Sequence, residues 1–234
     1  MKFENTDVWG FEHAIRGMRN PLESWSKSDS HEIILEYIDK DEEMMIYNKG
    51  SNYFVGKNDL ELIQKLIRAG SEHRKFMRQI FVSVDITAPL YWFKEFSTYK
   101  IGTTANSTST MHKLASTPIT MDCFEMGDFV DLGADKENYY SVGMVWENNI
   151  IPTLENLRLE YLETKDKRYW KELIRLLPES WLQTRTITMN YENLLSMVHQ
   201  RKNHKLTEWS IDFINWVRGL PYAKELIFAD EVKE

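Results

Sequence analysis

Residues 81–112 read FVSVDITAPLYWFKEFSTYKIGTTANSTSTMH, and this stretch decides the fold. From Ile80 to Ile86 apolar residues alternate with polar or small ones, which is the period of a half-buried strand. Pro89 ends this strand, and residues 90–96 place their aromatic side chains on one side of a predicted helix. We therefore predict a strand that passes directly into an aromatic helix.

Hydroxyl side chains dominate the segment after this helix, which reads TTANSTST from Thr103 to Thr110. Their donors and acceptors suit a phosphate group or the edge of a base. The same side chains also suit helix caps and turns, which is the more ordinary role for such a run. Because hydroxyl and backbone donors follow a helix here, we expect residues 98–110 to line the principal pocket.

The rest of the chain shows further helical and strand patterns. Residues 33–38 fit a helix or a strand, residues 44–55 fit a hairpin, and residues 118–149 are irregular. The clearer patterns predict a helix at Trp9–Met18, a helix capped by Asp59 and ended by Gly70, a helical region at Pro152–Leu177 broken at Lys165-Asp166, a strand at Thr184–Met189, a helix opened by Asn190, and a last buried helix at Trp209–Val217.

Composition bounds the class of protein. The chain has 234 residues, a hydrophobic fraction of 42% and no low-complexity tract, so we predict a single globular domain over residues 1–234. The net charge is −7 and the sequence has no basic cluster, so we find no evident basic surface for binding polymeric nucleic acid. No apolar run of membrane-spanning length and no signal-peptide core occur in the sequence. We therefore predict a cytoplasmic protein with no membrane partner.

Metal and nucleophile chemistry find little support in the sequence. Cys123 is the single cysteine, which excludes an internal disulfide and a cysteine-rich zinc site. The six histidines form no HExxH pair, so we predict no metal site. Carboxylate pairs cannot be assigned from spacing among 36 acidic residues, and we assign no catalytic residue.

The central segment resembles one known family in the order and spacing of its motifs. The flavin-dependent thymidylate synthases, the ThyX family, have a strand ending in Ala-Pro, a helix ending in Arg-His-Arg and a Ser after seven intervening residues. Here Ala88-Pro89 precedes the aromatic helix, residues 98–100 read Thr-Tyr-Lys in place of Arg-His-Arg, and Thr108 falls on the Ser. The frame is kept while most of the charged side chains are replaced.

Flanking segments extend the resemblance to most of the chain. Upstream, His73 matches the first His of a family motif whose Glu-His end is replaced by Arg78-Gln79. Downstream, Asn190 and Arg201 match in register, and Glu192 replaces an Arg. The early segment AIRGMRNPL resembles the family's Ala-Arg-x-Ser helix end. The resemblance implies an α+β fold, ThyX-like, with a central mixed sheet flanked by helices.

The resemblance also implies ligands. It predicts FAD as cofactor, a pyrimidine nucleotide as substrate, methylenetetrahydrofolate and NADPH as co-substrates, and a homo-oligomer, a tetramer or a dimer, because the family's sites are assembled across subunits. On this basis Lys100 and Arg201 converge on one anionic ligand. The implied cofactor-binding residues are His73, Lys100, Asn190 and Ser196, and the implied nucleotide-binding residues are Glu95, Thr103, Thr108, Arg175 and Arg201.

Three classes of function remain open after this comparison. The first is a divergent flavin-dependent enzyme that methylates or hydroxymethylates a pyrimidine nucleotide, and this is the class we predict. The second is a ThyX homologue that binds a nucleotide or flavin without turnover, because the replaced positions are those that hold both ligands in the family. The third is an unrelated or structural protein.

Overall fold

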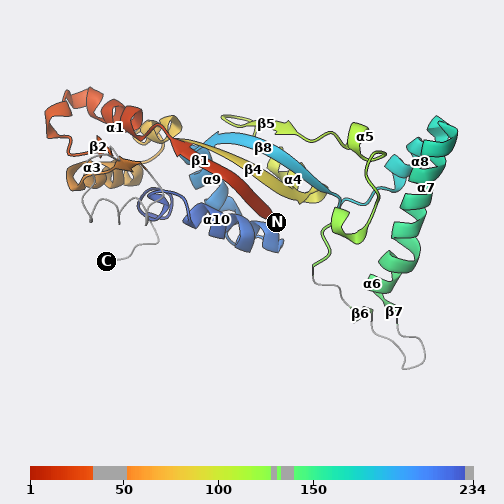
Figure 1. The fold of residues 1–234 in the computed structure, drawn as a ribbon. Helices are drawn as coiled ribbons and strands as arrows, with labels where there is room; N and C mark the ends of the chain where they lie inside the picture. The colour runs from red at the N-terminus through yellow and green to blue at the C-terminus, as the bar shows by residue number, and fades with distance from the viewer. Residues whose placement is uncertain (34–51, 128–130, 133–139, 230–234) are drawn as a thin grey trace. The chain divides into compact units, whose positions relative to one another are not determined.

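The computed structural model describes residues 1–33, 52–127, 131–132 and 140–229 (Figure 1). The chain divides into two compact units. Unit 1 comprises Met1–Lys2, Ile86–Thr98 and Asn106–Arg185, and unit 2 comprises Phe3–Asp85, Tyr99–Ala105 and Thr186–Glu234. A single domain over residues 1–234 stays a prediction.

Four strands form a sheet. The strands β1 (Lys2–Trp9), β4 (Phe81–Pro89), β8 (Leu182–Asn190) and β5 (Thr104–Ser107) are adjacent in the order β1-β4-β8-β5. The alternation predicted for β4 is confirmed, since Val82, Val84 and Ile86 are buried while the residues between them are partly exposed. Strand β1 was not predicted, because six of its eight residues are exposed and its sequence lacks a clean alternation.

Unit 2 packs its helices around aromatic side chains. Helices α1 and α9 both lie against the 3-10 helix η4, and α11 lies against α3 (Figure 1). Phe11 of α1 makes edge-to-face contacts with Tyr191 and Tyr222 at centroid distances of 5.9 and 5.5 Å. The helical elements of unit 2 are α1 (Phe11–Arg19), η1 (Asn20–Leu22), η2 (Trp25–Lys27), α3 (Lys57–Arg68), η4 (Lys75–Gln79), α9 (Tyr191–Arg201), the π-helix η7 (Glu208–Phe213), α10 (Ile214–Arg218) and α11 (Ala223–Leu226).

Unit 1 is built on a helical hairpin. Helices α7 (Ile151–Thr164) and α8 (Lys167–Leu176) pack side by side, and the break between them falls at Lys165-Asp166 as predicted (Figure 1). A buried cluster that includes Leu154, Leu173 and Trp181 fills the space beside the hairpin. The other elements are α4 (Leu90–Phe96), as predicted, α5 (Thr110–Lys113), η5 (Met121–Cys123), β6 (Asp131–Leu132), β7 (Tyr140–Ser141), α6 (Val142–Val145) and the π-helix η6 (Trp146–Ile150).

The structure corrects three sequence predictions. Asp59 does not cap α3, because Gly56 is the N-cap and the Asp59 carboxylate lies buried against Arg19. The buried helix at Trp209–Val217 begins as a π-helix and is followed by α11, so it is not the last helix. The region 118–149 contains short helices in its described part, and is not irregular throughout.

Two predicted segments lie mainly outside the described residues. Residues 34–51 hold most of the predicted element at 33–38 and of the predicted hairpin at 44–55. The flanking strands β2 (His31–Glu32) and β3 (Tyr53–Phe54) are described, and they pair antiparallel. In the described part of the chain, no helix is long and apolar enough to cross a membrane.

Candidate functional site

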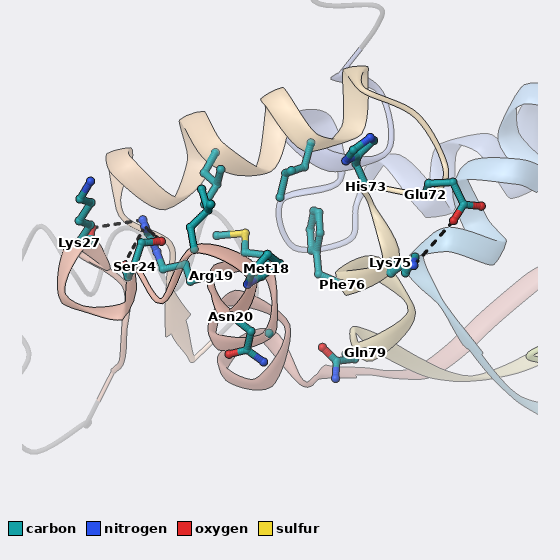
Figure 2. Close-up of a pocket in the computed structure, with 15 residues that line it drawn as sticks. Met18, Arg19, Asn20, Ser24, Lys27, Glu72, His73, Lys75, Phe76 and Gln79 are labelled. Atoms are coloured by element: carbon teal, nitrogen blue, oxygen red, sulfur yellow. Dashed lines mark hydrogen bonds and ion pairs between the residues drawn. The ribbon is translucent and has the colours of Figure 1, made fainter.

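A cavity of about 830 Å³, called cavity A here, opens in unit 2 between the end of α1, helix α3 and η4 (Figure 2). Met18 and Phe76 are buried in its wall, and Figure 2 shows them between the two helices. His73 lies near the Glu72–Lys75 ion pair, whose charged atoms are 3.7 Å apart. The lining residues are Gly17, Met18, Arg19, Asn20, Pro21, Leu22, Ser24, Lys27, Leu62, Leu66, Glu72, His73, Lys75, Phe76 and Gln79.

A buried ion pair fixes one wall of cavity A. The Nε atom of Arg19 donates to the Asp59 carboxylate at 2.6 Å, and these residues are 4% and 0% exposed. The second carboxylate oxygen accepts from the hydroxyls of Ser28 and Ser30 at 2.6 and 2.7 Å, and the remaining guanidinium nitrogens donate to Ser24 and to the Lys27 carbonyl. These hydrogen bonds satisfy both charges inside the protein, so this arginine serves the fold.

The pKa of Asp59 reflects the same contacts. Burial disfavours the charged carboxylate and by itself would raise the pKa. The hydrogen bonds from Ser28, Ser30 and Arg19 outweigh burial, so the pKa of Asp59 lies below its ordinary value. Asp59 therefore stays ionised in the folded protein at neutral pH.

A second cavity of about 580 Å³, called cavity B here, lies in unit 2 at the start of α9. Asn190 caps α9 and exchanges side-chain to backbone hydrogen bonds with Asn193. Asn193 also donates to the Ile101 carbonyl at 2.8 Å, which holds the preceding loop against the helix. Gly102 is required there, because its φ of +78° is left-handed and an added Cβ would lie 2.8 Å from the Asn193 side chain.

Charged and polar side chains surround cavity B. Arg74 forms an ion pair with Glu192 at 3.0 Å, and Arg78 lies on the same cavity wall. Ser196 accepts from Gln200 at 3.1 Å. The cavity brings together two predicted cofactor residues, Asn190 and Ser196, with donors suited to a polar ligand.

Arg201 is held by aromatic side chains at the end of α9. Its Nε atom donates to the Tyr99 hydroxyl at 2.8 Å, and its guanidinium carbon lies 4.7 Å from the centroid of the Trp209 ring. The Tyr99 hydroxyl in turn donates to Gln200 at 3.1 Å. Lys100 is exposed and lines neither cavity A nor cavity B. Convergence of Lys100 and Arg201 on one ligand stays a prediction.

Hydroxyl and amide groups also pair in unit 1, between β8 and the start of α5. The Thr108 amide donates to the Thr184 carbonyl at 2.9 Å, and the Thr108 hydroxyl accepts from the Thr184 amide at 3.3 Å. Gln183 donates to the Thr108 carbonyl at 2.8 Å and accepts from Arg185 at 2.9 Å. The guanidinium of Arg185 stacks on Phe93 of α4, 4.0 Å from the ring centroid.

The predicted site residues fall into separate places. Asn190 and Ser196 share cavity B, while His73 lines cavity A. Thr103 donates to the Tyr99 carbonyl and is partly buried in unit 2. In unit 1, the other candidates are Glu95 on α4, which is partly exposed, Thr108, which is exposed, and Arg175 on α8, which is exposed and paired with Glu172.

The expectation that residues 98–110 line the principal pocket is wrong for cavity A, which none of them lines. Ile101 and Gly102 line the smaller cavity B. The sequence analysis also missed Arg74 and Arg185. The signal for Arg185 was present in the alternation of β8, where Gln183 and Arg185 occupy the face that continues with the buried side chain of Ile187.

Metal chemistry gains no support from the geometry. In the ranges that the structure describes, no group of three or more His, Cys, Asp or Glu side chains is placed to hold a metal ion.

Comparison with known proteins gives a fold. No protein-family model matches the chain, and no curated protein matches it. Among solved structures, the flavin-dependent thymidylate synthase ThyX from Helicobacter pylori, complexed with FAD and dUMP, matches over 100% of both chains with a TM-score of 0.64 and 18% identity. A second structure of ThyX from this organism with FAD and dUMP matches equally fully, with a TM-score of 0.64 and 17% identity.

A third solved structure is the UMP/dUMP methylase PolB from Streptomyces cacaoi bound with 5-Br dUMP. It matches over 97% of this chain and 94% of its own, with a TM-score of 0.58 and 14% identity. The ThyX-like α+β fold predicted from the sequence is therefore confirmed. At these identities the likeness shows the fold, and the activity has to be argued from the site.

Proposed function

We propose that this protein is a flavin-dependent enzyme that reductively methylates or hydroxymethylates a pyrimidine nucleotide. The observation that carries the proposal is the full-length agreement of its fold with structures that hold FAD and dUMP. Because the agreement extends over both whole chains, it supports a ligand site built on the same frame. Fold by itself does not fix chemistry, so the residues of the two cavities have to suit the ligands.

Cavities A and B suit parts of a flavin dinucleotide. The volume of cavity A falls within the range of roughly 300–1,000 Å³ typical of small-molecule sites. Its buried Met18 and Phe76 can pack on a flat ring, and Lys27 and Lys75 can face a phosphate. His73 would hold the cofactor from cavity A. Asn190 and Ser196 would hold it from cavity B, and we assign Lys100 to the same cofactor.

The flavin would supply hydride transfer, which is the difficult step of such a reaction. Methylenetetrahydrofolate would supply the carbon and NADPH the reducing equivalents. The residues of this chain would then bind and orient the two substrates and exclude water. We assign no general acid, base or nucleophile to the protein.

The nucleotide would contact Glu95, Thr103, Thr108, Arg175 and Arg201. The Thr108 hydroxyl can donate to a phosphate oxygen, and Arg201 offers a guanidinium already oriented by Tyr99. Glu95 stands where the family has a nucleotide-facing Gln, and a carboxylate favours a base that carries an amino group. These assignments make a homo-oligomer, a tetramer or a dimer, part of the proposal.

A second candidate function is a nucleotide- or flavin-binding homologue without turnover. It is favoured by residues 98–100, which replace Arg-His-Arg. The Thr98 hydroxyl donates within its own helix end to the Glu95 carbonyl at 2.8 Å, and the Tyr99 hydroxyl is engaged by Arg201 and Gln200. The two arginines of that motif are replaced by Thr98 and Lys100, and neither residue restores a guanidinium group.

Two measurements on the purified protein separate these functions. The first is the visible flavin absorbance of the protein as purified and after FAD is added and free FAD removed. The second is mass spectrometry of dUMP incubated with FAD, NADPH and methylenetetrahydrofolate. Bound flavin with a methylated or hydroxymethylated product supports the enzyme. Bound FAD or dUMP without product supports the binding protein, and a protein that takes up neither ligand contradicts both.

Asn190→Ser is the matched variant for the flavin site. Serine keeps the cap of α9 while removing the side-chain amide that faces cavity B. Loss of one hydrogen bond of about 1 kcal/mol should weaken FAD binding roughly fivefold. An unchanged FAD affinity, with the melting temperature preserved, would remove Asn190 from the cofactor site.

A further inference from the structure

Three buried or partly buried arginines of this protein, Arg19, Arg74 and Arg158, are paired with carboxylates. Arg19 is 4% exposed and lies 2.6 Å from Asp59, and Arg158 is 6% exposed and lies 2.5 Å from Glu155. Arg74, more exposed than either, pairs with Glu192 at 3.0 Å. This pairing is expected, since a cation removed from water needs a compensating charge or strong acceptors.

Arg185 on β8 departs from this pattern. It is partly buried, and its guanidinium lies 4.0 Å above the Phe93 ring. Its one hydrogen bond to a side chain in the described ranges goes to the neutral amide oxygen of Gln183, at 2.9 Å. No carboxylate of residues 1–33, 52–127 or 140–229 forms an ion pair with it. Burial lowers the pKa of Arg185 below its ordinary value.

The surroundings of Arg185 hold it in place for a ligand. Gln183 is 8% exposed, and its amide nitrogen is fixed by the Thr108 carbonyl at 2.8 Å and the Thr110 hydroxyl at 3.4 Å. The side-chain oxygen of Gln183 therefore points to Arg185 and accepts its hydrogen bond. The ring of Phe93 also fixes the plane of the Arg185 guanidinium. A guanidinium fixed on its face and at Nε retains its two terminal nitrogens for a bidentate contact.

The geometry points to a phosphate group as the missing counter-anion. We propose that Arg185 binds the phosphate of the pyrimidine nucleotide, together with the hydroxyl of Thr108, whose carbonyl oxygen accepts from the Gln183 that also holds Arg185. The inference rests on the proposed function and adds a binding residue to it. Phosphate is favoured over an organic carboxylate because hydroxyl and guanidinium donors here can serve three acceptor oxygens. Arg175, by contrast, is exposed and already paired with Glu172.

The test compares Arg185→Gln with the unmodified protein. Calorimetry is run with dUMP, with deoxyuridine and with inorganic phosphate. Removing the guanidinium should raise the Kd for dUMP at least tenfold, weaken inorganic phosphate in the same direction, and leave the Kd for deoxyuridine within twofold. Arg185→Lys should fall between the two proteins, because an ammonium keeps the charge without the bidentate geometry.

Arg168→Gln is the control for charge and unit. Arg168 belongs to unit 1, is 90% exposed on its side chain and pairs with Asp166, so the same loss of charge should leave the Kd for dUMP within twofold. Circular dichroism confirms that each variant is folded, and an Arg185→Met variant provides an apolar replacement if the Gln variant aggregates.

Several results would overturn the inference. A Kd for dUMP within twofold of the unmodified protein would do so, as would an equal loss for deoxyuridine. A changed oligomer mass in Arg185→Gln with unchanged dUMP affinity would assign the counter-anion to a second copy of the chain. Unmodified protein that binds neither dUMP nor inorganic phosphate would also overturn it. Flavin absorbance, recorded on the same samples, tests the proposed function separately: an unchanged Kd for dUMP in Arg185→Gln, with FAD bound, overturns only the inference.

Discussion

Arg19 in unit 2 and Arg185 in unit 1 both carry a guanidinium into the protein, but their surroundings differ. Arg19 meets a buried carboxylate whose oxygens accept from two serine hydroxyls as well. Arg185 meets an aromatic face and one neutral amide. A cation satisfied from within stabilises the fold, whereas a cation left without a counter-charge is available to a ligand. The difference distinguishes a structural arginine from one that we propose binds a ligand.

The largest expected effect is on stability, when Arg19 loses the carboxylate that it pairs with. Asp59→Asn keeps the size of the side chain but leaves Arg19 buried without a counter-charge, and should lower the free energy of unfolding by about 3–5 kcal/mol. Urea titration followed by circular dichroism measures it. Glu61→Gln on the same helix breaks an exposed pair with Lys57 and should change stability by less than about 0.5 kcal/mol. Equal losses in the two variants would break the comparison.

Arg201 tests an intermediate case, a guanidinium held by aromatic rings and a tyrosine hydroxyl. Arg201→Ala should weaken nucleotide binding by about 1.5–3 kcal/mol, the usual worth of a hydrogen bond to a charged group. Lys100→Ala should weaken it less, since its ammonium is mobile and well hydrated. Calorimetry with dUMP measures both. If neither variant loses affinity while the fold is intact, the nucleotide does not bind through these cations.

Arg158→Gln compares an arginine that pairs with a carboxylate with Arg185, which lies in the same unit. Glu155 would lose two short contacts from the guanidinium and keep the Ile119 amide, so unfolding should become easier by about 1–3 kcal/mol. The expected sign is a lower melting temperature, unlike that for Arg185→Gln in the same unit. A melting temperature at or above that of the unmodified protein would mean that pairing with a carboxylate does not mark structural arginines here.

Acid titration gives the smallest effect and a defined sign. The pKa of Asp59 is lower in the folded than in the unfolded state, so its stabilising contribution is fully present above the ordinary value of 3.8. That contribution is lost as the pH falls through the folded-state pKa. The stability gap between unmodified protein and Asp59→Asn should therefore be constant near neutral pH and shrink below about pH 4. A gap that widens on acidification would contradict the direction of this pKa.

The sequence predicted elements whose signals are local. Helix α4 and the capping of α9 by Asn190 depend on residues close in the chain, and both are confirmed. Asp59 was misassigned because an aspartate in a first helical turn is typical of a cap, while its actual partner, Arg19, is forty residues away. Spacing alone cannot show such a pairing.

The candidate site was less predictable than the fold for a similar reason. The order of the motifs predicted Asn190 and Ser196, which share cavity B. The same motifs assigned the other residues only by their position, and at many of these positions this chain lacks the charged residue of the family. Arg185 occupies no such position. It becomes visible only when the partners of each arginine are known, and one of its partners, Phe93, comes from a distant part of the chain.

The most direct test of the comparison is the free energy of unfolding of Arg19→Met and Arg185→Met, each measured without ligand and with dUMP. We expect Arg19→Met to lose about 3–5 kcal/mol and to keep its response to dUMP. Arg185→Met should unfold no more easily than the unmodified protein without ligand. dUMP at a hundred times its Kd stabilises the unmodified protein by about 2.7 kcal/mol, and a tenfold or greater rise in Kd should remove about half of this or more in Arg185→Met. Equal destabilisation of both variants, with the dUMP response of Arg185→Met intact, would contradict the account.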